Sequence, residues 1–241
     1  MINTRGLIIS EVKYGEGHKM LTALTPEYGK IQIGANGIRS FKSKNSAGCS
    51  LFGYSEFILK ENREIYSLSS AENINNFYSI RNDVEKIALA AYFCELLNCV
   101  TRYGMPAHDI LKLALNTMYF LSESGTFIHV KPVFELRLMS ETGFAPNALS
   151  CVSCQSEEKL IFFSSKEGGM LCENCGSTGS KEHISNSALT AIRYILTADH
   201  KKIFSFTASG EVLTELTKIS EQYIISHLEH TPKSLRFLKS L

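Results

Sequence analysis

Two Cys-x-x-Cys pairs constrain this sequence more than any other feature. Cys151 and Cys154 form the first pair, and Cys172 and Cys175 form the second after seventeen intervening residues. This separation matches the pattern of a four-thiolate zinc site, in which each pair occupies a tight turn. The alternative is two redox dithiols or unpaired buried cysteines. Because four thiolates complete a tetrahedral coordination sphere, we expect one structural Zn²⁺ ion and no open position for a substrate.

The segment between the two pairs predicts a hairpin. An apolar run at 160–163 is followed by the turn residues of 167–169 and a second apolar run that begins at Met170. We therefore expect a zinc module over about 148–180. Its acidic residues outnumber its basic ones, which disfavours contact with a phosphate backbone. The module is predicted to stabilise the fold.

Length and composition indicate an ordinary globular protein. The chain has 241 residues, 44% of them hydrophobic, and a formal net charge of +1. Such a length suits one large or two modest domains, and any basic surface must be local. The N-terminal residues lack the long apolar core of a signal peptide, and the most apolar run, 87–100, is too short to span a bilayer. Three further cysteines, an odd number, fit reduced thiols, so we expect a cytoplasmic protein without membrane contact.

The first 80 residues are typical of β structure. Short apolar runs such as 6–10 and 30–33 alternate with turn signals, among them 14–17 and 26–29. Two further runs, at 55–60 and 64–69, suggest a hairpin. About five short strands predict a small closed barrel, for which the OB-fold is the commonest nucleic-acid-binding form of this size.

Beyond residue 80 the hydrophobic period becomes helical, which makes the predicted class α+β: an OB-fold domain over 1–80 and an α-helical domain over 81–241 with the zinc module inserted. Asn82 and Glu85 resemble a capping box at the start of the first helix. The further helices are expected at about 107–122, 129–141, 187–197 and 210–228.

A basic stretch lies within the predicted barrel. No acidic residue occurs between Tyr28 and Ser55, whereas four Lys or Arg residues do. The hydroxyl-rich loop at 37–48 suits contacts to phosphates, and Phe41 within it could stack on a base. A solvated loop explains the charges equally simply, and packing in the core explains Phe41. Residue chemistry alone leaves nucleic-acid binding as one of two interpretations.

Several ordered motifs together resemble the bacterial recombination mediator RecO family. They are Gly6-Leu-Ile-Ile with Tyr14-Gly-Glu-Gly17, Leu24-Thr25…Gly29-Lys30, Gly37-Ile-Arg39, Phe134-Glu-Leu-Arg-Leu138, Gly143-Phe-Ala-Pro-Asn147, the four cysteines, and Lys233-Ser-Leu-Arg-Phe-Leu238. His18 departs from the pattern, since the family usually has an acidic residue there.

The resemblance implies a DNA-repair function without catalysis. It implies binding of single- and double-stranded DNA, annealing of complementary strands, and loading of recombinase onto strands coated by single-strand-binding protein. The implied partners are the RecR protein and the C-terminal tail of that coating protein, in a nucleoid-associated location. Arg39 and Lys42 are the strongest candidates for DNA contact. The full predicted DNA surface is Arg5, Lys13, Lys19, Lys30, Arg39, Lys42 and Lys44.

The tail of the coating protein would need a cation beside an apolar pocket. Arg137, flanked by Phe134 and Leu138, is a candidate for this role. An ion pair between Arg137 and Glu141, four residues on, is the alternative.

Two other functions compete with a DNA-binding mediator. One is a zinc-stabilised adaptor that acts mainly through protein contacts. The other is a carboxylate-dependent hydrolase or nuclease, against which the acid-free stretch of the barrel argues. No Walker A sequence is present, so we expect neither ATPase activity nor a nucleotide cofactor.

Overall fold

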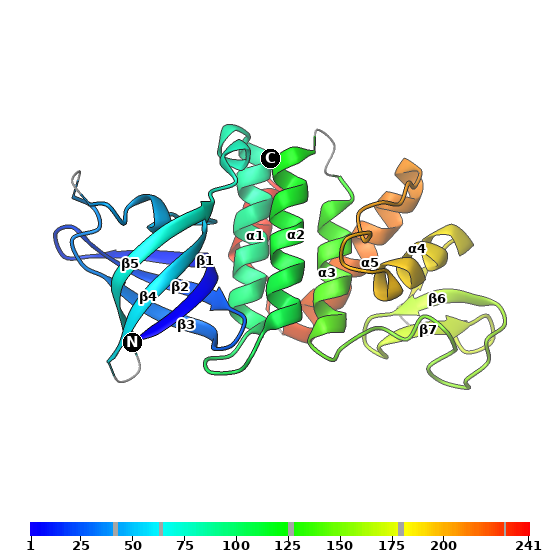
Figure 1. Cartoon of the computed structure of the whole chain (residues 1–241). Helices are drawn as coiled ribbons and strands as arrows, with labels where there is room; N and C mark the ends of the chain where they lie inside the picture. The colour runs from blue at the N-terminus through cyan, green and yellow to red at the C-terminus, as the bar shows by residue number, and fades with distance from the viewer. Residues whose placement is uncertain (41–42, 63–64, 125–127, 178–180, 229) are drawn as a thin grey trace. The chain divides into compact units, whose positions relative to one another are not determined.

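Five strands near the N-terminus close into a barrel (Figure 1). The computed structural model describes residues 1–40, 43–62, 65–124, 128–177, 181–228 and 230–241. The strand order around the barrel is β1-β2-β3-β5-β4. The strands are β1 (Ile2–Tyr14), β2 (His18–Thr25), β3 (Gly29–Ala35), β4 (Tyr54–Asn62) and β5 (Ile65–Asn75). The predicted OB-like barrel is confirmed.

Closure of the barrel depends on the length and bending of β1. Its first half pairs with β4 and its second half with β2, and the register with β2 shifts between Ile8 and Ser10. An irregularity of this kind bends a strand and increases its twist, so that one strand can serve two neighbours. The ring is completed by a short parallel contact, in which Ile33 and Gly34 of β3 pair with Tyr66 and Ser67 of β5.

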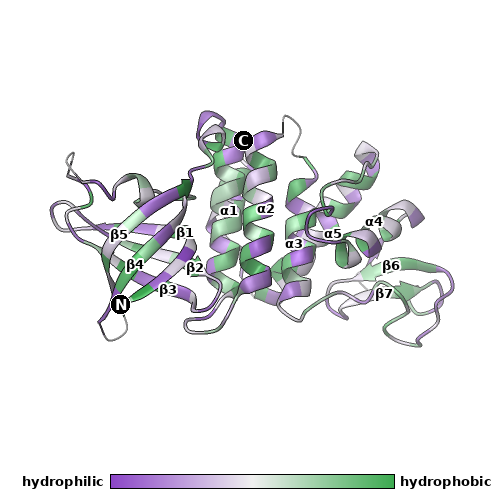
Figure 2. Cartoon of the chain, viewed as in Figure 1, coloured by the Kyte–Doolittle hydropathy of each residue, from purple (hydrophilic) through white to green (hydrophobic). Residues whose placement is uncertain are grey.

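Alternating residues of the strands fill the barrel. Side chains along a strand point to opposite faces in turn, so every second apolar residue can reach the interior. Figure 2 shows hydrophobic and hydrophilic residues mixed along these strands. The buried core of the barrel comprises Ile8, Leu21, Ala23, Ile31, Ile33, Ala35, Ile38, Cys49, Phe57, Leu59 and Ala71.

Two antiparallel helices follow the barrel and lie side by side in Figure 1: α1 (Val84–Val100) and α2 (His108–Glu123). Hydrophobic residues predominate along α1 in Figure 2, as expected for a central helix. The predicted capping box at Asn82 is wrong. Asp83 is the N-cap, and its carboxylate accepts hydrogen bonds from the backbone N–H groups of Glu85 and Lys86. Asn82 instead ends the short 3-10 helix η2 (Tyr78–Asn82).

The loop between α1 and α2 is fastened to the turn between β2 and β3. Three backbone hydrogen bonds join them: Lys30 to the carbonyl of Arg102, Gly104 to that of Tyr28, and Ala107 to that of Pro26. Gly29 lies at the centre of this contact with φ of +61°. A Cβ atom there would lie 2.0 Å from the carbonyl oxygen of Met105, so only glycine fits.

The structure divides into two compact units, residues 1–123 with 232–241, and residues 124–231. In the first unit, the short helix α6 (Lys233–Leu238) packs against α1, with Leu235 buried. Helix α6 was not predicted from the sequence. The division at residue 80 into two domains stays a prediction.

The second unit joins three helices to a small sheet. In it, α3 (Val130–Glu141) packs against α5 (Gly210–Leu228) and α4 (Asn186–Thr197). The sheet has the order β7-β6-β8, formed by β6 (Leu160–Ser164), β7 (Gly169–Cys172) and β8 (Glu182–His183). The expected hairpin is therefore present, whereas the third strand was not predicted. Among the described residues, no helix is long and apolar enough to cross a membrane.

Candidate metal centre and nucleic-acid interface

The four paired cysteines come together in the second unit. Their Sγ atoms all lie within 4.8 Å of one another. In the first pair, the backbone N–H of Gln155 donates to the carbonyl of Cys151, and in the second that of Gly176 donates to the carbonyl of Cys172, both at 2.8 Å. Each bond closes a tight turn that presents two sulfurs to the same point. The hairpin of β6 and β7 holds the two turns together, since Cys172 ends β7.

Backbone N–H groups favour the thiolate form at two of the four cysteines, Cys151 and Cys172. Burial raises the pKa of Cys151, but hydrogen bonds from the backbone N–H groups of Cys172, Cys154 and Ser153 outweigh it and lower the pKa to about 6. The backbone N–H of Cys175 likewise lowers the pKa of Cys172. Metal ligation requires the thiolate form, so the donor set and its surroundings fit a bound metal ion. Among the described residues, the group that could hold a metal ion consists of these four cysteines alone, without a histidine or a carboxylate.

The predicted DNA-binding residues of the barrel differ in whether their side chains already contact other groups of the protein. Lys19 forms an ion pair with Glu11, with 2.8 Å between Nζ and the carboxylate, and Arg5 lies 3.7 Å from Glu56. Both basic side chains therefore already have an acidic partner. Lys42, like Phe41, lies outside the described residues.

Lys30 is buried, with 9% of the residue exposed. Its ammonium donates to the carbonyl of Asn98 at 2.6 Å and lies 4.8 Å from the centre of the Tyr103 ring. Burial lowers the pKa of Lys30, and the nearby Cys99 opposes this shift. Lys30 therefore makes contacts within the first unit, and its side chain exposes little surface that a phosphate could contact.

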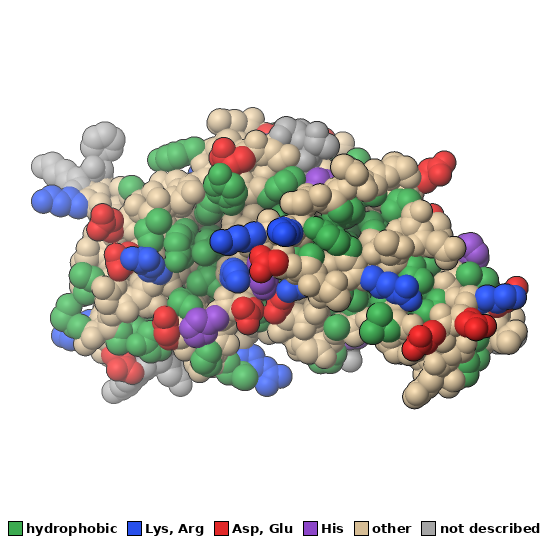
Figure 3. Space-filling view, turned by 45° about the vertical axis from the view of Figure 1, so that its right-hand side comes forward, with side chains coloured by type: hydrophobic (Ala, Val, Ile, Leu, Met, Phe, Trp, Pro, Cys, Tyr) green, Lys and Arg blue, Asp and Glu red, His purple; other side chains and the backbone are tan. Residues whose placement is uncertain are grey.

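Lys13, Arg39 and Lys44 are exposed, and none has an acidic group within 4 Å among the residues that the structure describes. The loop carrying Arg39 is fastened to the turn between β1 and β2, since the backbone N–H of Arg39 donates to the carbonyl of Gly17 at 3.1 Å. In OB-folds the loop between the first two strands takes part in binding oligonucleotides. In the face shown in Figure 3, Lys and Arg side chains lie among Asp and Glu side chains, so basic groups form no large uniform patch there.

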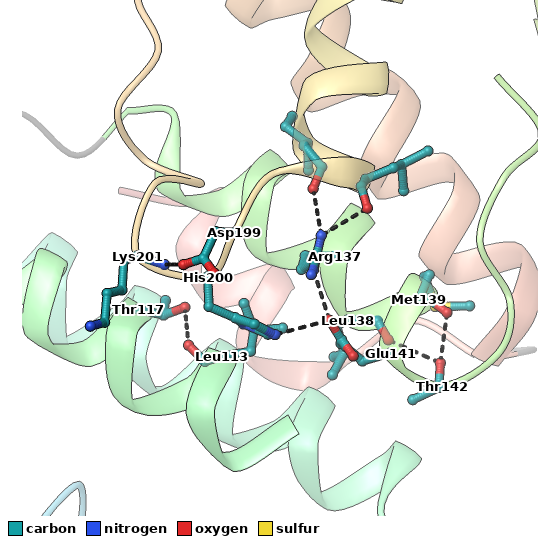
Figure 4. Close-up of polar contacts among 12 residues, drawn as sticks. Leu113, Thr117, Arg137, Leu138, Met139, Glu141, Thr142, Asp199, His200 and Lys201 are labelled. Atoms are coloured by element: carbon teal, nitrogen blue, oxygen red, sulfur yellow. Dashed lines mark hydrogen bonds and ion pairs between the residues drawn. The ribbon is translucent and has the colours of Figure 1, made fainter. Parts of the chain in front are cut away.

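Arg137 makes several contacts inside the second unit (Figure 4). Its Nε donates to the carboxylate of Glu141 at 2.7 Å, and its Nη1 donates to the carbonyls of Ile195 and Leu196 at 2.8–3.2 Å. The alternative ion pair with Glu141 is thus present, and His200 lies 3.4 Å from the same carboxylate. Arg137 therefore ties α3 to the C-terminal end of α4. Phe134 and Leu138 are fully buried and present no surface to a partner.

One cleft, which lies in the first unit, was not predicted from the sequence. Tyr28, Lys30, Ile31 and Gln32 line it from β3 and its preceding turn, Tyr66 from β5, and Tyr103 and Gly104 from the loop after α1. These residues are widely separated along the chain. A lone tyrosine in a strand or loop carries no signal that it lines a cleft.

The chain thus combines an OB-like barrel that is followed by helices with a helical unit that carries a cluster of four cysteines, and this combination defines its class. Comparison with known sequences identifies the family within that class. Residues 1–77 match the family model described as "Recombination protein O N terminal", and residues 81–236 match "Recombination protein O C terminal". The chain belongs to the RecO family.

Individual relatives resemble this chain over nearly their whole length. A protein of Acetivibrio thermocellus is 37% identical over 100% of this chain and 97% of its own length. One of Alkaliphilus metalliredigens is 34% identical over 95% and 94% of the two chains. One of Caldicellulosiruptor saccharolyticus is 33% identical over 99% and 98%. All three are named "DNA repair protein RecO".

Proposed function

We propose that this protein is a DNA-repair mediator that binds single- and double-stranded DNA through its barrel, anneals complementary strands and helps to load recombinase onto strands coated by single-strand-binding protein. Family membership over the whole chain carries the proposal. The exposed cations of Lys13, Arg39 and Lys44 support it, because they lie on an OB-like barrel without acidic partners nearby in its described part.

Annealing requires no catalytic residue. Two strands repel each other through their phosphates, and basic side chains that neutralise phosphates reduce this repulsion and raise the rate of encounter. Exposed cations on loops can follow a flexible strand without reading its bases. We therefore propose a non-enzymatic protein that uses no nucleotide cofactor.

We propose that the four cysteines hold one structural Zn²⁺ ion. Cys151, Cys154, Cys172 and Cys175 would provide four thiolates, a donor set that zinc occupies in structural sites. The ion would contribute free energy of folding by joining the two turns. The exposed ion pair of Lys159 and Glu173 and the other acids nearby disfavour DNA contact at this module.

We propose RecR and the acidic, apolar tail of single-strand-binding protein as partners, in a cytoplasmic, nucleoid-associated location. Arg137 would have to give up its contacts with Glu141 and α4 before it could bind a terminal carboxylate. If the protein acted only as an adaptor for such partners, DNA binding would be absent.

The test is binding of a labelled single strand, measured by fluorescence anisotropy across a salt series. The triple variant Arg39→Ala/Lys42→Ala/Lys44→Ala should bind more weakly and lose up to about 2 units of the log–log salt slope. The matched control, Lys166→Ala/Lys201→Ala/Lys202→Ala, removes equal charge from exposed residues of the second unit and should bind like the wild type. Equal losses in the two variants would contradict the barrel site. A wild type that binds no DNA would favour the adaptor.

A further inference from the structure

The tyrosine-lined cleft of the first unit has a volume of about 590 Å³, which is within the range of small-molecule binding sites. Tyr28, Ile31 and Tyr66 contribute to it from the barrel, and Tyr103 and Gly104 from the loop after α1. Tyr28 and Tyr66 are partly buried and pack against the barrel core. The barrel wall of the cleft is thus anchored in the barrel core.

The cleft exists because the barrel opens next to β3. Among the described residues, pairing between β3 and β5 is limited to Ile33 with Tyr66 and Gly34 with Ser67, and no described strand pairs with the part of β3 before Ile33 on that side. The loop after α1 is held near this opening by its hydrogen bonds to Tyr28 and Lys30. Strand and loop therefore frame a preformed space.

Tyr103 provides an aromatic surface at this space. The residue is 56% exposed, although its hydroxyl accepts a hydrogen bond from the Gln32 amide at 3.3 Å. The Lys30 ammonium lies 4.8 Å from the ring centre, and its bond to the Asn98 carbonyl fixes it there. A ring held by an amide and a cation is oriented in advance for stacking, which reduces the entropy lost on binding.

Polar groups at the cleft can bond to the edge of a planar ligand. Gln32 offers an amide, and the tyrosines offer hydroxyls. A tyrosine hydroxyl is protonated at neutral pH and can donate, and burial, Glu61 and Tyr28 raise the pKa of Tyr66 further. Aromatic faces combined with a few donors and acceptors suit a heteroaromatic ring better than a phosphate or an aliphatic chain.

We propose that this cleft binds one unstacked nucleobase of a single strand, with Tyr103 as its stacking partner. The proposal rests on the proposed function, because the barrel must first hold the strand through its phosphates. A paired base in a duplex has both faces stacked on neighbouring bases and cannot enter. The cleft would therefore distinguish single strands from duplexes, which the exposed cations alone do not.

The experiment measures wild type and variants against three ligands of equal length: a thymine single strand, a duplex, and a strand of abasic deoxyribose phosphates. Tyr103→Ala should weaken binding of the thymine strand about fivefold or more, with an unchanged salt slope. Its binding of the abasic strand and of the duplex should equal that of the wild type. Tyr103→Phe, which retains the ring, should bind the thymine strand nearly as well as the wild type.

Tyr119→Ala is the matched control, because Tyr119 is 59% exposed on α2 and does not line the cleft. It should leave all three affinities unchanged. The proposal is overturned if Tyr103→Ala binds like this control, or if it loses affinity equally for the abasic strand. If the wild type binds the thymine and abasic strands equally, the base site fails while DNA binding by the barrel stands. If the wild type binds none of the ligands, both fail.

Photocrosslinking provides a second measurement that does not depend on a variant. A single strand that carries one bromodeoxyuridine should crosslink to a peptide containing Tyr103 or Tyr66, identified by mass spectrometry. Crosslinks confined to other parts of the chain would contradict the assignment.

Discussion

The side chain of Glu95, on α1, accepts hydrogen bonds from both the backbone N–H and the hydroxyl of Ser234, in the first turn of α6. Its other carboxylate oxygen accepts from the backbone N–H of Lys233 at 3.0 Å. The residue before α6 is Pro232, whose side chain makes no capping bond. Glu95 thus caps a helix 138 residues further along the chain, which a local sequence pattern would not reveal.

Replacing Glu95 by Ala should destabilise the first unit by roughly 0.5–2 kcal/mol, the usual cost of losing an N-cap acceptor. Urea unfolding followed by circular dichroism would measure the shift in midpoint. Glu95→Gln keeps one acceptor and the same shape, so it should lose less. An alanine variant as stable as the wild type would show that the bonds to Lys233 and Ser234 contribute nothing.

Gly29→Ala should destabilise the protein far more than Gly37→Ala. Both glycines have positive φ, +61° and +65°, so both variants incur the roughly 1–2 kcal/mol strain of the left-handed conformation. A Cβ at Gly29 would also overlap the carbonyl oxygen of Met105, whereas nothing lies within 4 Å of one at Gly37. Thermal melting of the two variants measures the difference. Equal melting temperatures would contradict the close approach of the loop after α1.

Substitution of Cys151→Ser with Cys154→Ser should abolish metal binding and reduce stability and solubility, because metal ligation supplies free energy of folding. Elemental analysis should find about one zinc ion per wild-type chain and none in the variant. Cys99→Ser, which changes an exposed cysteine outside the cluster, is the control and should retain the ion. Full zinc content with unchanged melting in the double variant would refute the site.

Stability should decline on the alkaline side partly because of Cys94. Burial raises the pKa of this thiol in the folded state, whereas the unfolded thiol ionises near pH 8.5. The stabilisation is fully present below the unfolded pKa and is lost as pH rises above it, by up to about 1.4 kcal/mol per pH unit. Under reducing conditions, Cys94→Ala should show a shallower fall in unfolding free energy between pH 9 and 10. Leu97→Val, which truncates a buried residue of the same helix without a titrating group, should retain the wild-type slope.

Local patterns explain which parts of this fold could be predicted from the sequence. The cysteine spacing, the alternation in the barrel and the helical periods are each set by neighbouring residues, and the predicted elements follow them closely. Helix α5, for example, has the expected bounds of Gly210 and Leu228. The two residues of β8 and the six of α6 are too short for a period to be recognised.

Contacts between distant segments explain what the sequence could not reveal. In the sequence Lys30 is one basic residue among several, but its environment is set by Asn98, near the end of α1, and by Tyr103, in the loop that follows α1. Arg137 likewise has partners at 195 and 196 in addition to Glu141. The error at Asn82 is local, since Asp83 offers an equally good capping side chain one residue later.

The return of residues 232–241 to α1 has a consequence for folding during synthesis. The ribosome releases the barrel and the first two helices early, yet the last contacts of their unit come from a segment made after residues 124–231. The second unit can therefore acquire its structure while the first still lacks α6, with one face of α1 uncovered. A chain that ended at a stop codon near position 231 would lack α6. Its first unit, although synthesised first, would then be incompletely folded.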